Sequence, residues 1–182
     1  MILRLVLGDQ LNEKHSWFQK VDSNVLYLFQ EVRSETDYVV HHIQKVVGIF
    51  LGMRHLAQHL KDKGHRVEYL KITDSNQQST FVSNIEKIVK EYSIHQIEYQ
   101  EPDEFRVDED LKSLKSLSLE VIMVSSEHFL TNRSDLKEMF VGKKTYLMES
   151  FYRKMRVKWN VLVDENSQPL EGKWNFDHDN RK

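Results

Sequence analysis

The 182-residue chain contains no cysteine, only two prolines and six glycines. Without cysteine it cannot form a disulfide, ligate an iron–sulfur cluster through thiolates or supply a thiol nucleophile. No run approaches the roughly 20 apolar residues of a membrane-spanning helix. The apolar opening, 1–7, is too short for a signal core and is interrupted by Gly8-Asp9. We therefore expect a cytoplasmic protein with no membrane contact.

The chain also lacks a strong charge of either sign, because it has 26 basic and 28 acidic residues and a net charge of −2. No global field draws such a chain to nucleic acid or to an anionic membrane, so any contact of that kind has to be local. The hydrophobic content of 40% is enough for a buried core. Length and composition together suit one domain, or one domain with an appendage.

Short apolar runs alternate with helical patterns along the first two thirds of the chain. This alternation predicts an α/β fold, with a doubly wound, five-stranded parallel sheet flanked by helices, Rossmann- or flavodoxin-like. The predicted strands are 2–7, 24–29, 67–72, 96–99 and 119–124. We expect a domain over 1–130 and a helical or irregular extension over 131–182.

The stretch 34–64 is predicted as one long helix. Ser34 can cap it, apolar residues recur every three or four positions from Val39 to Leu60, and Gly64 can take the left-handed turn that ends it. A helix of about 28 residues would be roughly 40 Å long. It would connect the second and third strands as a right-handed crossover.

Polar residues follow the first predicted strand as Gly8-Asp9-Gln10. Ligands of doubly wound sheets lie beyond the carboxyl ends of the strands. Glycine lets the backbone approach a ligand, while aspartate and glutamine offer an acceptor and a mixed donor–acceptor. The alternative is a plain strand-to-loop turn. No glycine-rich phosphate-binding pattern follows, which argues against a dinucleotide site.

A second polar cluster surrounds the start of the long predicted helix. A helix N-terminus favours an anionic or electron-rich group nearby, and such a cluster could bind an aromatic ligand within a polar rim. Helix capping and surface charge are the alternative. The cluster consists of Glu31, Glu35, Tyr38, His41 and His42.

Two further patterns are weak signals for a metal or for catalysis. His55 and His59 are four residues apart and share a helix face, but no third ligand is evident, so we expect no metal site. Ser125-Ser126 with His128 could form a nucleophile and a base, yet no glycine elbow flanks the serines. We predict no catalytic residue in this chain.

The segment 143–159 contains six Lys or Arg residues and one acid, with aromatic residues interleaved. This pattern could contact phosphates and bases, and it is also typical of an amphipathic helix that docks on a second domain. We favour docking. The polar end that follows the aromatic residues of 174–176 predicts that more protein follows Lys182.

Several blocks resemble the deoxyribodipyrimidine photolyase-related proteins, the bacterial photolyases and cryptochromes that carry an iron–sulfur cluster. The resemblance covers essentially the whole chain. It departs from the family at Leu51-Gly52, where a small pair is usual, and at Glu171, where a glycine is usual. The matching blocks are 5–11 (LVLGDQL), 38–42 (YVVHH) with Lys45, 53–57 (MRHLA), 148–156 (MESFYRKMR) and 172–177 (GKWNFD) with Asn180-Arg181.

The resemblance implies the N-terminal antenna domain of a flavoprotein, either a cryptochrome or a DNA photolyase that repairs (6-4) photoproducts. The antenna would be 6,7-dimethyl-8-ribityllumazine. FAD, a 4Fe-4S cluster and the DNA contacts would belong to a further helical domain that docks on 143–176, so this chain alone would be inactive. The implied chromophore site is Gly8, Asp9, Gln10, Leu11, Val32, Glu35, Tyr38 and His41.

Within that site the resemblance implies distinct roles. Asp9 and Glu35 would accept hydrogen bonds from the ring or its ribityl chain. Gln10 would satisfy the pyrimidinedione edge, and Tyr38 would stack on the ring or bond to it. The alternative function is a stand-alone α/β module that binds a small molecule or a protein without catalysis.

Overall fold

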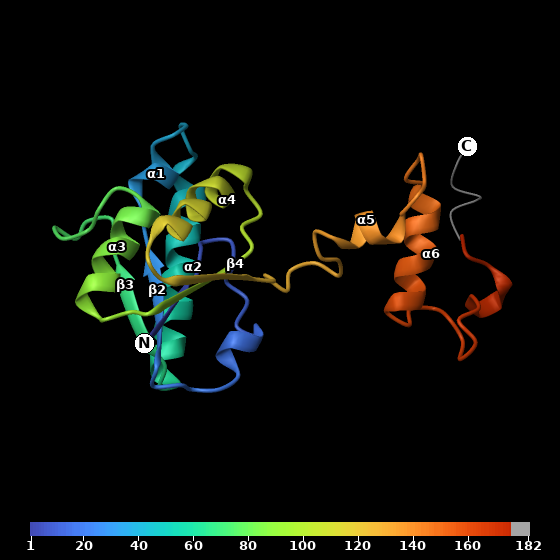
Figure 1. Cartoon of the computed structure of the whole chain (residues 1–182), viewed down its shortest axis with the longest axis horizontal. Helices are drawn as coiled ribbons and strands as arrows, with labels where there is room; N and C mark the ends of the chain where they lie inside the picture. The colour runs from blue at the N-terminus through green and yellow to red at the C-terminus, as the bar shows by residue number, and fades with distance from the viewer. Residues whose placement is uncertain (176–182) are drawn as a thin grey trace. The chain divides into compact units, whose positions relative to one another are not determined.

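The computed structural model describes residues 1–175, which fall into an N-terminal unit, Met1–Phe129, and a C-terminal unit that begins at Leu130. The N-terminal unit is an α/β fold (Figure 1). Its five strands form one sheet in the order β3-β2-β1-β4-β5, and every pair is parallel. The predicted fold class is therefore confirmed. The strands are β1 (Ile2–Leu5), β2 (Val25–Gln30), β3 (Arg66–Leu70), β4 (Gln96–Gln100) and β5 (Glu120–Val124).

Helices cover both faces of this sheet. One face packs on α3 (Phe81–Glu91) and α4 (Phe105–Lys112) through a core that includes Leu5 and Leu28. The opposite face packs on α2 (Ile43–Asp62) through a second core around Phe29. Because both faces are covered, all six residues of β2 are buried, which explains its continuous apolar character. Two short 3-10 helices, η1 (Ser16–Phe18) and η2 (Ser113–Ser116), complete the unit.

The prediction of one helix over 34–64 is wrong. The chain forms a single turn, α1 (Arg33–Thr36), and α2 begins only at Ile43, where the His42 side chain accepts a hydrogen bond from the Gln44 backbone N–H at 3.2 Å. Val39 and Val40 continue the apolar period but are exposed, so no packing opposes their poor helix propensity. The predicted end of the long helix at Gly64 is confirmed, since α2 ends at Asp62 and Gly64 takes the left-handed conformation, with a φ of +91°.

The other helical segments near these strands are short. In the loop after β1, helical structure is limited to the three residues of η1. α4 ends at Lys112, and η2 follows it directly. The N-terminus of α3 is capped by Thr80, whose Oγ1 accepts from the Ser83 backbone N–H at 3.3 Å.

The C-terminal unit contains α5 (Asp135–Met139), α6 (Met148–Lys158) and a 3-10 turn, η3 (Leu170–Gly172). Its centre is Arg156, which is 3% exposed and donates to the backbone carbonyls of Val161, Leu162 and Trp174. The expected helical and irregular extension is thus present. Phe176, Asp177 and Asn180-Arg181 of the matching block lie outside the described residues. Within 1–175, no helix has the length and apolarity needed to cross a membrane.

Candidate functional site

A cavity of about 270 Å³ opens at the carboxyl edge of the sheet, in the N-terminal unit. It lies where β1 sits between β2 and β4, which is where the chain reverses the direction in which it adds strands. Residues after β1 and β2, the α1 turn, the first half of α2 and the start of α4 all line it. This is the position at which doubly wound sheets bind their ligands.

The interior of the cavity is apolar and draws on both faces of the sheet. A Cβ placed on Gly8 would lie 2.7 Å from Ile49 Cγ2 and 3.3 Å from Met53 Sδ. Only glycine therefore allows α2 to approach the end of β1 this closely. The apolar lining is Leu7, Val32, Val46, Ile49, Phe50, Met53, Phe81, Pro102 and Val107.

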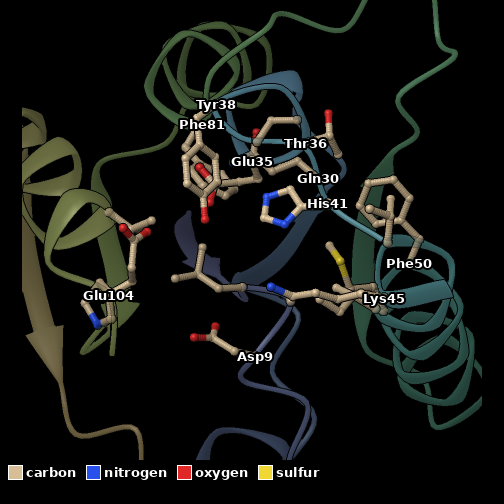
Figure 2. Close-up of a pocket in the computed structure, with 18 residues that line it drawn as sticks. Asp9, Gln30, Glu35, Thr36, Tyr38, His41, Lys45, Phe50, Phe81 and Glu104 are labelled. Carbon is tan, nitrogen blue, oxygen red and sulfur yellow. The ribbon is translucent and has the colours of Figure 1, made fainter. Parts of the chain in front are cut away.

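A polar rim surrounds this interior. In the view of Figure 2, Asp9 and Glu35 lie on opposite sides of the cavity, and the ammonium of Lys45 reaches inward from α2. Carboxylates, an amide, a phenol, an imidazole and an ammonium thus converge on one apolar space, which suits a flat ligand with heteroatoms at its edges. The polar lining is Asp9, Gln30, Glu35, Thr36, Tyr38, His41, Lys45 and Glu104.

Arg106 of α4 organises one side of the rim. Its two Nη atoms donate to the Glu35 carboxylate at 2.9 and 2.7 Å, and Nη2 also donates to Glu104 at 2.8 Å. The guanidinium lies 4.2 Å from the centre of the Tyr38 ring, within the range of a cation–π contact. The hydrogen bonds to Glu35 raise the pKa of Arg106, with partial burial opposing that rise. Arg106 therefore ties the α1 turn to α4 beside the cavity.

Three buried polar atoms at the cavity have no hydrogen-bond partner in the described part of the chain. They are both amide atoms of Gln30, which is 2% exposed, and Nε2 of His41. The His41 ring packs edge-on against Tyr38, with 5.1 Å between ring centres. Buried polar groups in proteins are nearly always satisfied, so these three atoms are exceptions within the described part of the chain.

Asp9 has a perturbed carboxyl group. Burial raises its pKa, and the neighbouring carboxylates of Asp103 and Glu35 raise it further, against the lowering effect of His128. The residue still reaches solvent at the cavity mouth. A carboxyl group in these surroundings binds a proton, or accepts a ligand N–H or O–H, more readily than a free aspartate does.

Six of the eight residues assigned by resemblance line this one cavity: Gly8, Asp9, Val32, Glu35, Tyr38 and His41. Gln10 and Leu11 do not line it. The Gln10 amide accepts from the Leu7 backbone N–H and donates to the carbonyls of Gln100 and Glu101, so it braces the loop after β1 against the loop after β4. The side chain of Leu11 packs instead against α2 at Gly52.

Two members of the polar cluster at 31–42 do not line the cavity and instead stabilise the fold. His42 caps α2. Glu31 is fully buried and accepts hydrogen bonds from Arg54 at 2.7 and 3.0 Å, from the Tyr69 hydroxyl at 2.7 Å and from the Ile72 backbone N–H at 3.0 Å. Burial alone would raise the pKa of Glu31, but these hydrogen bonds outweigh it and lower the pKa.

The histidine and serine patterns do not form sites of their own. Among residues 1–175 no group of three or more His, Asp or Glu side chains is placed to hold a metal ion. Nε2 of His59 lies 3.6 Å from a carboxylate oxygen of Glu13. The Ser126 hydroxyl faces the backbone N–H of His128 rather than its ring, and Nδ1 of that ring lies 3.5 Å from Asp103.

Basic side chains of α6 are largely engaged within the C-terminal unit. Arg153 pairs with Glu149, Lys158 pairs with Asp135 at 2.7 Å, and Arg156 is buried against carbonyls. These cations are therefore less available to phosphates than the sequence pattern suggested. Exposed apolar residues remain on the unit, among them Tyr146, Leu147, Met148 and Trp159.

Comparison with known proteins identifies the family. The model of the family described as deoxyribodipyrimidine photo-lyase-related protein matches residues 4–182. A (6-4) photolyase of Agrobacterium fabrum is 34% identical over 182 residues, which are 99% of this chain and 36% of that protein. The uncharacterized protein R852 of Acanthamoeba polyphaga mimivirus is 27% identical over 143 residues, 76% of this chain and 70% of that protein. The chain thus spans about a third of the photolyase's length, and it belongs to the deoxyribodipyrimidine photolyase-related family.

Proposed function

We propose that this chain is the antenna domain of a photolyase-related flavoprotein and that its cavity holds 6,7-dimethyl-8-ribityllumazine. The observation that carries the proposal is the convergence of six residues, assigned to the chromophore by family resemblance, on one cavity at the carboxyl edge of the sheet. These residues come from two separate segments, the loop after β1 and the stretch between β2 and α2. Their meeting is a property of the fold that no single motif provides.

The residues present fit such a chromophore. Small-ligand cavities range from roughly 300 to 1,000 Å³, so a space of about 270 Å³ suits one compact ring system rather than a dinucleotide. The apolar lining from both faces of the sheet can cover the faces of a ring and exclude water from it. The carboxylates of Asp9 and Glu35 can accept from ring or hydroxyl donors, and Arg106 holds Glu35 in place for that role.

When bound, the lumazine would absorb light and transfer the excitation to a flavin. The task of this chain is to orient the ring and to keep it rigid and dry. Tyr38 contacts both Arg106 and His41, so its ring is restrained in the cavity wall. The Glu35–Arg106 pair restrains the α1 turn in the same way.

We place the flavin, the iron–sulfur cluster and the DNA contacts in another part of a longer protein. The chain has no cysteine with which to ligate a cluster. The exposed apolar residues of the C-terminal unit are suited to docking on that further domain, in line with the expectation for 143–176. The (6-4) photolyase that the chain resembles is a longer protein, and lesion repair would be an activity of the whole molecule.

Titration of the purified chain with 6,7-dimethyl-8-ribityllumazine, followed by fluorescence anisotropy, tests the proposal. We expect binding in the micromolar range, weakened about tenfold or more by Asp9→Ala or Glu35→Ala, because each removes a charged acceptor at the ring. Glu109→Ala is the matched control, since this carboxylate lies on α4, is exposed and does not line the cavity. Circular dichroism of each variant checks folding. Absence of binding at tens of micromolar lumazine, or equal binding by all three variants, would contradict the proposal.

A further inference from the structure

Two glutamines end the strands on either side of β1. Gln30 is the last residue of β2 and Gln100 the last residue of β4. Both are buried, at 2% and 1% exposure, and neither side-chain amide has a hydrogen-bond partner within residues 1–175. A buried unpaired amide lowers stability, so each calls for an explanation.

Only Gln30 lines the cavity; Gln100 does not. Figure 2 shows Gln30 beside His41 and Glu35, at the inner wall. Its neighbours leave it without an internal partner, because Glu35 is held by Arg106 and the adjacent Glu31 is turned into its own hydrogen bonds with Arg54 and Tyr69. The amide atoms of Gln30 are themselves covered in this structure, so pairing with a ligand requires the side chain to turn toward the cavity that it lines.

A primary amide carries one acceptor and two donors in a single plane. It is complementary to a ring edge on which an N–H and a C=O are adjacent, because two parallel hydrogen bonds then form at once. Pyrimidinedione rings, including lumazines and flavins, present such an edge. Nε2 of His41, also covered and unpaired, belongs to a ring on the same side of the cavity.

We infer that Gln30 determines the ligand specificity of this cavity by forming hydrogen bonds to the imide edge of the ring. Its Oε1 accepts the ring N–H and its Nε2 donates to the adjacent ring carbonyl. The inference rests on the proposed function and narrows the ligand to rings that carry an unsubstituted imide. It also gives to Gln30 the role that resemblance assigned to Gln10, whose amide is already engaged by backbone groups at 3.2 and 3.3 Å.

A paired change in protein and ligand tests the inference. The probes are 6,7-dimethyl-8-ribityllumazine and its N3-methyl derivative, in which the methyl group removes the imide N–H. The proteins are the full chain, Gln30→Leu and Gln100→Leu. We expect the wild-type chain to bind the methylated probe about 10- to 100-fold more weakly, because one hydrogen bond is lost and its partner stays buried. Gln30→Leu should bind the two probes within about threefold of each other, since the group that senses the imide is gone.

Gln100→Leu is the matched control and should keep the full discrimination of the wild type. Both leucine variants remove a buried unpaired amide, so each should melt at the same temperature as the wild type or a few degrees higher, which shows that they fold. If the N3-methyl group of the probe weakens binding equally in the wild type and in Gln30→Leu, the inference is overturned and the proposed function stays intact. An equal loss of discrimination in Gln100→Leu would overturn it as well. Failure of the wild type to bind either probe would refute the proposed function, and the inference with it.

Discussion

The buried carboxylate of Glu31 links three elements of the N-terminal unit. It follows β2 directly, and its side chain is bonded to Arg54 of α2, to Tyr69 of β3 and to the Ile72 backbone N–H after β3. Its backbone also pairs with Leu70, at 2.9 Å from its own N–H to that carbonyl. Glu31→Gln keeps the volume of the side chain and removes its charge, so this variant isolates the electrostatic part of the network.

The size of the stability loss in Glu31→Gln follows from the hydrogen bonds of the Glu31 carboxylate. Each carboxylate oxygen accepts two hydrogen bonds, so a glutamine amide inevitably places its NH₂ group against a donor of Arg54. Hydrogen bonds to charged groups contribute about 1.5–3 kcal/mol, and disrupting a buried pair costs about 3–5 kcal/mol. Arg54 is 44% exposed and can regain water, which reduces the loss to about 2–4 kcal/mol. For a chain of this length that corresponds to a fall in Tm of roughly 5–15 °C.

The destabilisation by Glu31→Gln should become smaller as the pH falls. The pKa of Glu31 is lower in the folded protein than its usual value of 4.5. Its contribution to stability is therefore complete above about pH 4.5 and disappears as the pH falls through the lower, folded-state pKa. The difference in unfolding free energy between wild type and Glu31→Gln should shrink accordingly on acidification.

Urea unfolding followed by circular dichroism, at pH 7 and again at acidic pH, measures both effects. Glu68→Gln is the control, because Glu68 is a partly exposed carboxylate on β3 that also bonds to a tyrosine, Tyr92, at 3.0 Å. We expect it to lose less than about 1 kcal/mol. If Glu31→Gln loses no more than this control at pH 7, or if its loss does not change with pH, the reasoning is refuted.

Three other predictions concern the cavity and one helix end. Gly8→Ala should destabilise the protein by about 1–3 kcal/mol in thermal unfolding, because the new Cβ would meet Ile49 at 2.7 Å; an unchanged Tm would show that α2 can move away. Arg106→Met should cost only about 1 kcal/mol of stability yet weaken lumazine binding, since it releases Glu35. Urea unfolding and lumazine titration of this variant, measured side by side, separate the two effects. Thr80→Ala should lose about 1 kcal/mol in urea unfolding and Thr80→Ser almost nothing, because serine keeps the capping oxygen; equal losses would argue against the cap.

The fold and the main site follow from information that is local in the sequence. Apolar runs that alternate with helical patterns predict a parallel sheet, and parallel strands bring their carboxyl ends to one edge. Asp9 after the first strand and Glu35, Tyr38 and His41 after the second therefore meet once β1 and β2 are neighbours. No knowledge of side-chain orientation is needed for that conclusion.

Other features depend on direction and distance, which a linear pattern does not contain. Arg106 meets Glu35 across 71 positions of sequence, and nothing near either residue announces the pair. Gln30 ends a fully buried strand, so its place beside the cavity is evident only from the structure. Gln10 follows the first strand, but its amide bonds to backbone groups and does not line the cavity. The break before α2 was hidden because Val39 and Val40 continue an apolar period on a surface that nothing covers.

The central position of β1 has a consequence for synthesis. β1 is made first, but Ile2 pairs with Gln96 on one side, so half of its backbone hydrogen bonds await a segment made some ninety residues later. Until then the partial sheet β3-β2-β1 carries an open edge, a hazard for aggregation. The α4 wall of the ligand cavity arrives later still, with Val107. The proposed chromophore would therefore stabilise only a finished N-terminal unit, and it would not stabilise the nascent chain while the edge of its sheet is open.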